Sequence, residues 1–121
     1  MTPEQQRIKI AEACGWTWKQ GAHADFLWHD SSNIAHSSVC KERSPLGCIA
    51  DLPDYLNDLN AMHEAEKVLL GMCDNDPQAD LWISYLANLV LAAPCCLREH
   101  ATAAQRAEAF LKTLDLWEES K

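Results

Sequence analysis

Histidine and cysteine side chains in the first half of the chain are the residues best suited to bind a metal ion. Several lie close together in the sequence and could supply the four ligands of a zinc site: His23, His29, His36, Cys40 and Cys48. Zinc would stabilise an irregular loop, but this spacing matches no closed zinc-binding pattern. A zinc-stabilised structural module is therefore only our third interpretation, and we predict no metal site and no cofactor.

Two acidic segments resemble metal-binding motifs only in part. The segment His63–Glu66 begins like the helix of zinc proteases, but Lys67 stands where the second histidine is required. Residues 74–80 space their carboxylates like the start of a calcium loop, yet they lack its glycine and its final glutamate. We expect a partly buried histidine and two solvated glutamates in the first segment, and a helix cap at Asp76 in the second.

Covalent catalysis would require a thiol beside a histidine and a third group that orients the histidine. Cys48 in a loop and Cys96 near His100 are the only candidates. Free cysteines are more often small core residues, and the chain has no Ser-His-Asp arrangement, phosphate-binding loop or dinucleotide fingerprint. We therefore predict no catalytic residues and no enzymatic activity.

Three tryptophans, Trp16, Trp18 and Trp28, lie near one another in two segments rich in strand-forming residues. We expect these segments, residues 16–19 and 26–29, to form a β-hairpin. The tryptophans could form an exposed aromatic platform for a ligand, because tryptophan anchors many interfaces. They could equally pack the sheet onto helices, and we expect core packing for at least two of them.

Helix caps indicate where the expected helices begin. Thr2 and Gln5 form a capping box before a helix over residues 3–14, and Thr102 and Gln105 form a second one. A middle helix begins at Asp54 or Asn57 and ends near residue 70, and a third begins at Asp76-Pro77. Apolar residues at helical spacing mark the core-facing sides of the last two helices: Trp82, Tyr85, Leu86, Leu89 and Val90, and then Ala107, Phe110, Leu111 and Leu114.

The remaining segments carry weaker signals. Residues 30–50 show no period and are expected to be a loop with at most one strand, at 38–41; residues 95–98 could form another. Together these elements predict an α+β fold: a single α/β/α sandwich-like domain over residues 1–121, with about four helices around a small antiparallel sheet.

The chain is acidic, with 10 lysines and arginines against 18 aspartates and glutamates and a net charge of −8. Residues 51–80 hold eight acids and one base, Lys67, which gives −7 for that segment alone. This balance excludes simple binding to the phosphate backbone of nucleic acids. We expect the acids of this segment to bind a partner: Asp51, Asp54, Asp58, Glu64, Glu66, Asp74, Asp76 and Asp80.

Neither a membrane span nor an export signal is visible in the sequence. A cytoplasmic location follows, in which the six cysteines would be free thiols.

Three stretches together resemble the small phage proteins of the phage ABA-sandwich family. They are Ile10–Trp16 (IAEACGW), Leu52–Lys67 (LPDYLNDLNAMHEAEK) and His100–Leu111 (HATAAQRAEAFL). The resemblance covers about half of the chain and implies an α/β/α sandwich and a phage or prophage origin. It implies no activity and no catalytic residues. One departure is Asp115, where such sequences tend to have a helix-ending glycine.

These observations favour a small phage accessory protein that acts by protein–protein interaction. Its acidic segment would dock on a host or phage protein with a basic surface, and a host defence complex such as a CRISPR effector would offer one. The alternative is a protein that binds or sequesters a small, nucleotide-like ligand in a concave site lined by the tryptophans, a kind of site that is often shared across a homodimer.

Overall fold

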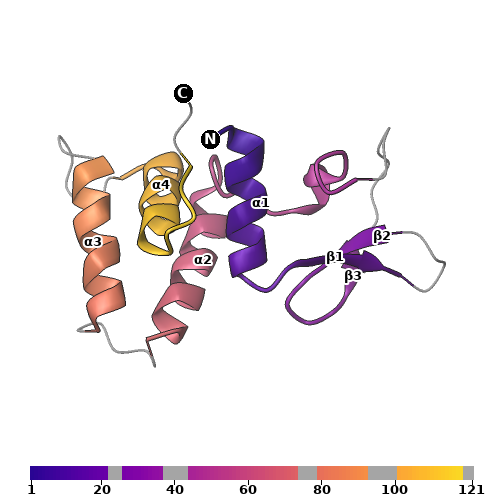
Figure 1. Cartoon of the computed structure of the whole chain (residues 1–121), viewed down its shortest axis with the longest axis horizontal. Helices are drawn as coiled ribbons and strands as arrows, with labels where there is room; N and C mark the ends of the chain where they lie inside the picture. Colours follow the sequence, from indigo (N-terminus) through magenta and orange to yellow (C-terminus); the bar gives the residue numbers. More distant parts are fainter. Residues whose placement is uncertain (22–25, 37–43, 74–78, 93–100, 119–121) are drawn as a thin grey trace.

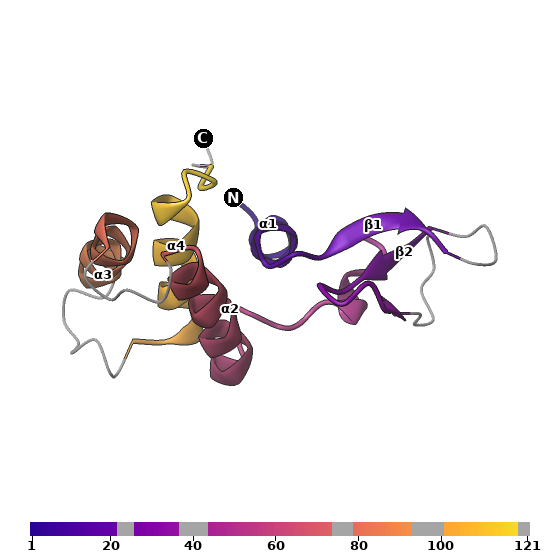
Figure 2. The same cartoon turned by 90° about the horizontal axis from the view of Figure 1, so that it is seen from below.

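A computed structural model describes residues 1–21, 26–36, 44–73, 79–92 and 101–118 of the chain. In this part of the chain it contains four α-helices, one 3₁₀ helix and three strands: α1 (Pro3–Ala13), β1 (Thr17–Gln20), β2 (Phe26–His29), β3 (Ala35–His36), η1 (Ile49–Asp51), α2 (Leu59–Gly71), α3 (Asp80–Ala92) and α4 (Ala103–Thr113). The expected α+β class is confirmed. The sheet and η1 lie at one end of the molecule, α1 lies next to them, and α3 lies at the other end (Figures 1 and 2).

Both expected capping boxes are present, at the starts of α1 and α4. The Thr2 hydroxyl accepts a hydrogen bond from the amide of Gln5 (3.1 Å), and the Gln5 side chain accepts one from the amide of Thr2 (3.0 Å). Thr102 and Gln105 repeat this exchange at 3.1 and 2.8 Å. The first residues of both helices are therefore determined by local side chains.

The same two helices also end in the same way. Each is followed by a residue with positive φ, Gly15 at +100° and Asp115 at +58°. The next amide then bonds to a carbonyl five residues earlier, from Trp16 to Ala11 (2.9 Å) and from Leu116 to Leu111 (2.8 Å). This is the Schellman geometry, which satisfies carbonyls at the helix end. Asp115 thus adopts the conformation that glycine favours, as the sequence suggested.

The expected hairpin is confirmed and is extended by a third strand in the order β1-β2-β3, with both pairs antiparallel. The third strand, Ala35–His36, is shorter and earlier than the one expected at 38–41, which lies outside the described residues. Asp30 determines the turn before it, because its Oδ1 accepts the amides of Ser32 (2.9 Å) and Ile34 (3.0 Å).

Helix α2 begins later than expected. Its N-cap is Asp58, whose side chain accepts the amide of Asn60 (3.0 Å), and not Asp54 or Asn57. Those two residues form the preceding turn, in which the Asn57 amide group donates to the Asp54 carboxylate (3.2 Å). The start of α3 expected at Asp76 and the strand expected at 95–98 lie outside the described residues.

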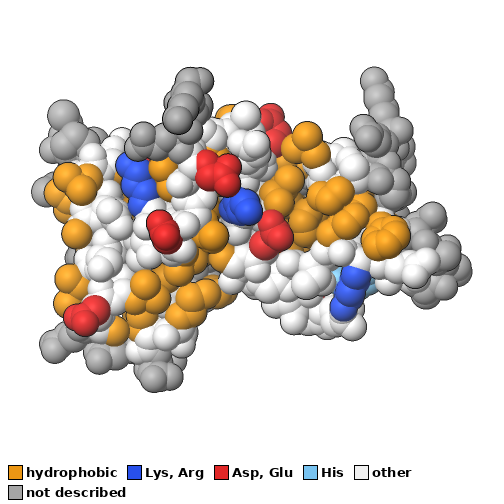
Figure 3. All heavy atoms as spheres, viewed as in Figure 1, with side chains coloured by type: hydrophobic (Ala, Val, Ile, Leu, Met, Phe, Trp, Pro, Cys, Tyr) orange, Lys and Arg blue, Asp and Glu red, His pale blue; other side chains and the backbone are white. Residues whose placement is uncertain are grey.

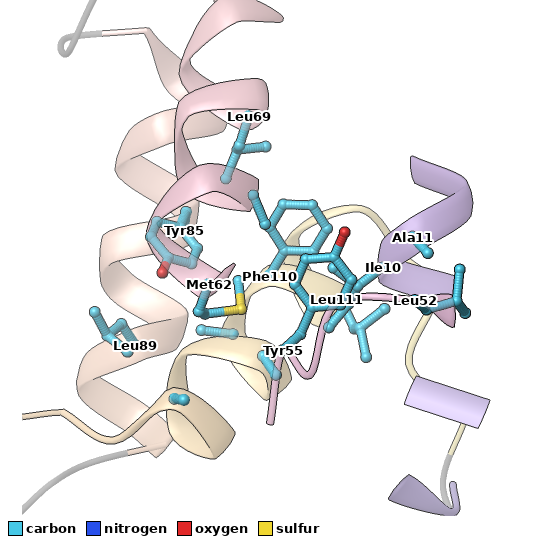
Figure 4. Close-up of a cluster of buried hydrophobic side chains, with 14 of the residues drawn as sticks. Ile10, Ala11, Leu52, Tyr55, Met62, Leu69, Tyr85, Leu89, Phe110 and Leu111 are labelled. Carbon is cyan, nitrogen blue, oxygen red and sulfur yellow. The ribbon is translucent and has the colours of Figure 1, made fainter. Parts of the chain in front are cut away.

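The core lies among the four helices (Figure 4), where side chains of the helices and of the segment before α2 meet. Helix α3 packs mainly against α4 and buries Tyr85 and Leu89. Val90, which we expected on the same face, is 61% exposed. That expectation is wrong because Tyr85 and Leu89, four residues apart, define the inner face, and the next residue is rotated by about 100° away from it.

In α4 the expected inner face is confirmed, since Ala107, Phe110 and Leu111 are buried. Leu114 and Trp117 are partly buried against the same core. None of the described helices combines the length and apolar character needed to cross a membrane.

Candidate functional site

A pocket of about 420 Å³ lies where the end of α1, the β2–β3 turn and α2 meet. Ligand sites in proteins typically have volumes of about 300–1,000 Å³ and mostly apolar walls. The residues that line it are Cys14, Trp16, Ser31, Pro53, Tyr55, Asn60, Ala61, Glu64, Ala65 and Val68. They come from four separate stretches of the chain, so the tertiary fold creates the pocket.

Gly15 brings the first two of these stretches together. Its positive φ turns the chain sharply after α1, and a Cβ placed on it would lie 3.0 Å from the Cβ of Ser31. A side chain at this position would therefore push the β2–β3 turn away from the helix end. The same sharp turn directs Trp16 to the pocket.

Trp16 is half-buried and is held in place by the sheet. Its ring lies 4.8 Å from the ring of His36, measured between centroids. The Nε2 atom of His36 is in turn 3.0 Å from the Oδ2 atom of Asp30. The hydrogen bond from His36, together with the amides of Ile34 and Ser32, holds the pKa of the Asp30 carboxyl below its usual value.

Cys14 and Tyr55 form a neutral polar pair in the pocket wall. Burial raises the pKa of the Cys14 thiol to about 11, and a hydrogen bond to Tyr55 opposes this only in part. Burial, together with the nearby Cys14, also raises the pKa of Tyr55. Both groups keep their protons at neutral pH, so Cys14 is a poor nucleophile.

The segment that carries Tyr55 is attached to α1 by Arg7. The Arg7 guanidinium donates to the backbone carbonyls of Leu52 and, at 2.8 Å, of Pro53. These contacts fix the distance between α1 and the segment before α2. They thereby determine the width of the pocket at Tyr55.

Helix α2 forms the remaining wall with residues one turn apart. Asn60, Glu64 and Val68 follow one another at intervals of four, which places them on one side of the helix. Glu64 is the only acidic residue of the pocket lining, and its Oε1 atom pairs with the Nζ atom of Lys67 at 3.0 Å. Both side chains are about 70% exposed, at 72% and 73%, so this ion pair stabilises the fold little.

The two other tryptophans are used for packing the sheet. Trp28 is fully buried, and its Nε1 donates to the Pro45 carbonyl (3.1 Å). Trp18 lies opposite it in the register and contacts its ring edge at a centroid distance of 5.4 Å. Core packing for at least two of the three tryptophans is therefore confirmed, and only Trp16 lines the pocket described above.

The acids expected to bind a partner differ in how far they reach the solvent. Asp58, Glu64 and Asp80 are exposed, whereas Asp51 and Asp54 are only partly exposed. Asp74 and Asp76 lie outside the described residues. Asp58 caps the start of α2, whereas Asp80 is the first residue of α3. On the face seen in Figure 3 the acidic side chains lie singly among apolar and uncharged ones.

Glu66 is oriented toward the interior, so our expectation that it is solvated is wrong. Its side chain is 12% exposed, and its Oε2 atom lies 3.1 Å from Nη1 of Arg106, which is 8% exposed. The hydroxyl of Tyr85 donates to the same oxygen (2.8 Å), and Nδ1 of His63 lies 2.9 Å from Oε1. These polar contacts join α2, α3 and α4. His63 itself is half-exposed, where we expected partial burial.

The residues considered for zinc do not assemble in the part that the structure describes. His29 contacts the backbone carbonyl of Leu27 (3.0 Å), His36 contacts Asp30, and Cys48 is buried in the core. The other two residues of that set, like the Cys96–His100 pair, lie outside the described residues. Among described residues, no three histidine, cysteine or acidic side chains are close enough to hold a metal ion.

No family model, curated protein or solved structure matches the chain. The resemblance to the phage ABA-sandwich family therefore stays a prediction.

Nothing in the sequence marks Cys14 and Tyr55 as site residues. Tyr55 belongs to a segment without helical or strand periodicity, and Cys14 was read as the end of a helix. The Gly15-Trp16 step was the only local signal, because a helix-ending glycine followed by an aromatic residue directs that residue back toward the helix.

Proposed function

We propose that this chain is a non-enzymatic binding protein whose acidic surface docks on a host or phage protein with a basic surface. The observation that carries the proposal is the exposure of Asp58, Glu64 and Asp80, in a segment whose only base is Lys67. Carboxylates in this setting attract a basic surface over distances of about 10 Å at moderate salt, which speeds association and selects partners.

The outer face of α3 supports a protein as the partner. Ile83, Val90 and Leu91 are 51%, 61% and 75% exposed, and they follow Asp80 at helical spacing. Protein interfaces combine an apolar centre with a polar rim, and exposed apolar patches often mark them. The partner would thus present apolar side chains beside lysines or arginines, and Asp80 would meet the basic residues at the edge.

A role against host defence is the more specific form of this proposal. It is supported by the resemblance to small phage proteins and by the acidity of the chain. Complexes that handle nucleic acid, such as a CRISPR effector, need basic surfaces to hold phosphates, and an acidic protein can occupy such a surface. These complexes are therefore the partners to test first.

The test compares two variants of equal charge in affinity capture from bacterial lysate. The first is Asp54→Asn, Asp58→Asn and Asp80→Asn, where asparagine preserves the cap at residue 58. The matched control changes three exposed acids outside the segment: Glu4→Gln, Glu12→Gln and Glu118→Gln. Bound proteins are quantified by mass spectrometry at low and moderate salt.

We expect a basic protein that is retained by the unmodified chain and by the control, is lost from the aspartate variant, and binds more weakly as salt rises. Equal loss from both variants would indicate an effect of total charge and would contradict a specific acidic surface. Retention by both variants would show that these aspartates do not contact the partner.

A further inference from the structure

We propose that the pocket between Trp16 and α2 binds a small organic cation, namely a primary amine on an aromatic or alkyl body. Glu64 belongs both to this pocket and to the acidic surface proposed above, but the two proposals are tested independently, because the aspartate variant used above leaves Glu64 unchanged. The proposal stands on the charge of the lining, on its aromatic walls and on the weak ion pair at its rim.

The charged group in the lining favours a cation over an anion. Glu64 is a carboxylate, and none of the lining residues is a lysine or arginine. Cys14 and Tyr55 are protonated, so they add no charge. A phosphate group placed here would meet the Glu64 carboxylate, whose ion-pair partner Lys67 lies outside the lining. The nucleotide-like ligand considered from the sequence is therefore disfavoured, and an ammonium group is favoured.

Aromatic walls add a second attraction for a cation. Trp16 and Tyr55 both line the pocket, and the faces of aromatic rings attract ammonium groups, with tryptophan the strongest. The half-buried Trp16 ring is fixed by its contact with His36, so little ordering is needed when a ligand binds. A flat or alkyl body would pack against Trp16, Ala65 and Val68.

The polar rim determines where the amine would lie. Glu64 points to solvent and already holds one ammonium group, that of Lys67. Because that pair is exposed, a ligand ammonium can replace Lys67 at little cost. Asn60, one turn before Glu64, supplies an amide oxygen that can accept a second hydrogen bond from the same ammonium.

The test is isothermal titration calorimetry of the full chain with three probes. Tryptamine has an aromatic body and an amine, tryptophol replaces the amine by a hydroxyl, and adenosine monophosphate has an aromatic body and a phosphate. We expect tryptamine to bind about two- to fivefold more tightly than tryptophol, because its ammonium forms an ion pair with the exposed Glu64 carboxylate, whereas the hydroxyl of tryptophol is neutral. Adenosine monophosphate is expected not to bind.

Three variants locate the site. Glu64→Gln should weaken tryptamine about two- to fivefold and weaken tryptophol less, whereas Glu12→Gln, an exposed acid of α1 outside the lining, should change neither. Trp16→Leu should weaken both indoles, and circular dichroism establishes that this variant is folded.

Two results would overturn the proposal. One is the absence of tryptamine binding at about 1 mM. The other is binding that Glu64→Gln does not change. Stronger binding of adenosine monophosphate than of tryptamine would instead restore the nucleotide interpretation.

Discussion

Replacing Arg106 by methionine is expected to destabilise the protein strongly, because Arg106 is the cation that balances Glu66 between α2 and α4. The two side chains are 8% and 12% exposed, and Nη1 lies 3.1 and 3.3 Å from the two carboxylate oxygens. Arg106 also donates to the Ala101 carbonyl (3.2 Å), which would lose that donor. The Arg106→Met variant thus leaves a nearly buried charge without its partner.

The size of the effect follows from this geometry. Breaking a buried ion pair by removing one partner costs about 3–5 kcal/mol. Tyr85 still donates to Glu66 (2.8 Å) in the variant, so we expect the lower end, about 3 kcal/mol. Replacing both residues, as in Glu66→Met with Arg106→Met, removes both charges and should cost much less than the sum of the two single changes.

Urea denaturation of the wild type, the two single variants and the double variant measures this coupling as a double-mutant cycle. The control is the exposed pair Glu64 and Lys67, whose charged atoms lie 3.0 Å apart on α2. Its coupling energy should be at most about 0.5 kcal/mol.

The reasoning would be refuted by additive single effects at Glu66 and Arg106. An Arg106→Met cost below about 1 kcal/mol, similar to that of a surface pair, would refute it equally.

Four further expectations concern the helix ends and the thiol. Asp115→Gly should stabilise the protein by about 0.5–1 kcal/mol, because the φ of residue 115 is +58°. Gly15→Ala should destabilise it by more than about 1 kcal/mol, because the φ of residue 15 is +100° and Ser31 lies close to it. Thermal unfolding measures both changes. Thr102→Ala should cost about 1 kcal/mol in urea denaturation through loss of its cap bond, and no cost would contradict the capping role. The rate of Cys14 alkylation, measured by peptide mapping, should rise with pH through about 11. The free energy of unfolding should fall as pH rises above 9, because the thiol of the unfolded chain deprotonates before that of the folded chain. An alkylation rate that levels off near pH 9 would contradict this.

The helix ends could be predicted wherever the signal was local. Thr2, Gln5, Thr102 and Gln105 determine the starts of α1 and α4 through contacts with neighbouring residues, and these predictions are confirmed. The start of α2 is harder to predict from the sequence, because Asp54, Asn57 and Asp58 are all good N-cap residues. Which of them caps the helix depends on how the preceding turn packs.

The inward orientation of Glu66 could have been predicted from two sequence patterns taken together. Glu66 shares a helix face with Met62 and Leu69, and Arg106 shares one with Ala103 and Phe110. When two helices each carry a single charged residue on an apolar face, and the two charges are of opposite sign, a buried ion pair between the helices is indicated. Each pattern alone predicts a solvated residue at the edge of the core, as we had assumed for Glu66.

The pocket could not be predicted, because no local pattern joins its walls. Ser31 and Tyr55 lie in irregular segments, and they come together through the sharp turn at Gly15 and the Arg7 contacts to the backbone before α2. Such contacts depend on the folded geometry of distant segments.

The packing of α1 against α4 has a consequence for synthesis on the ribosome. Ile10 and Ala11 of α1 belong to the same core as Phe110 and Leu111, which are translated about a hundred residues later. A nascent chain that has emerged only as far as α3 therefore still exposes the apolar side chains that α4 covers. Productive folding must wait until α4 has left the ribosome exit tunnel, and until then the growing chain exposes apolar surface that can aggregate.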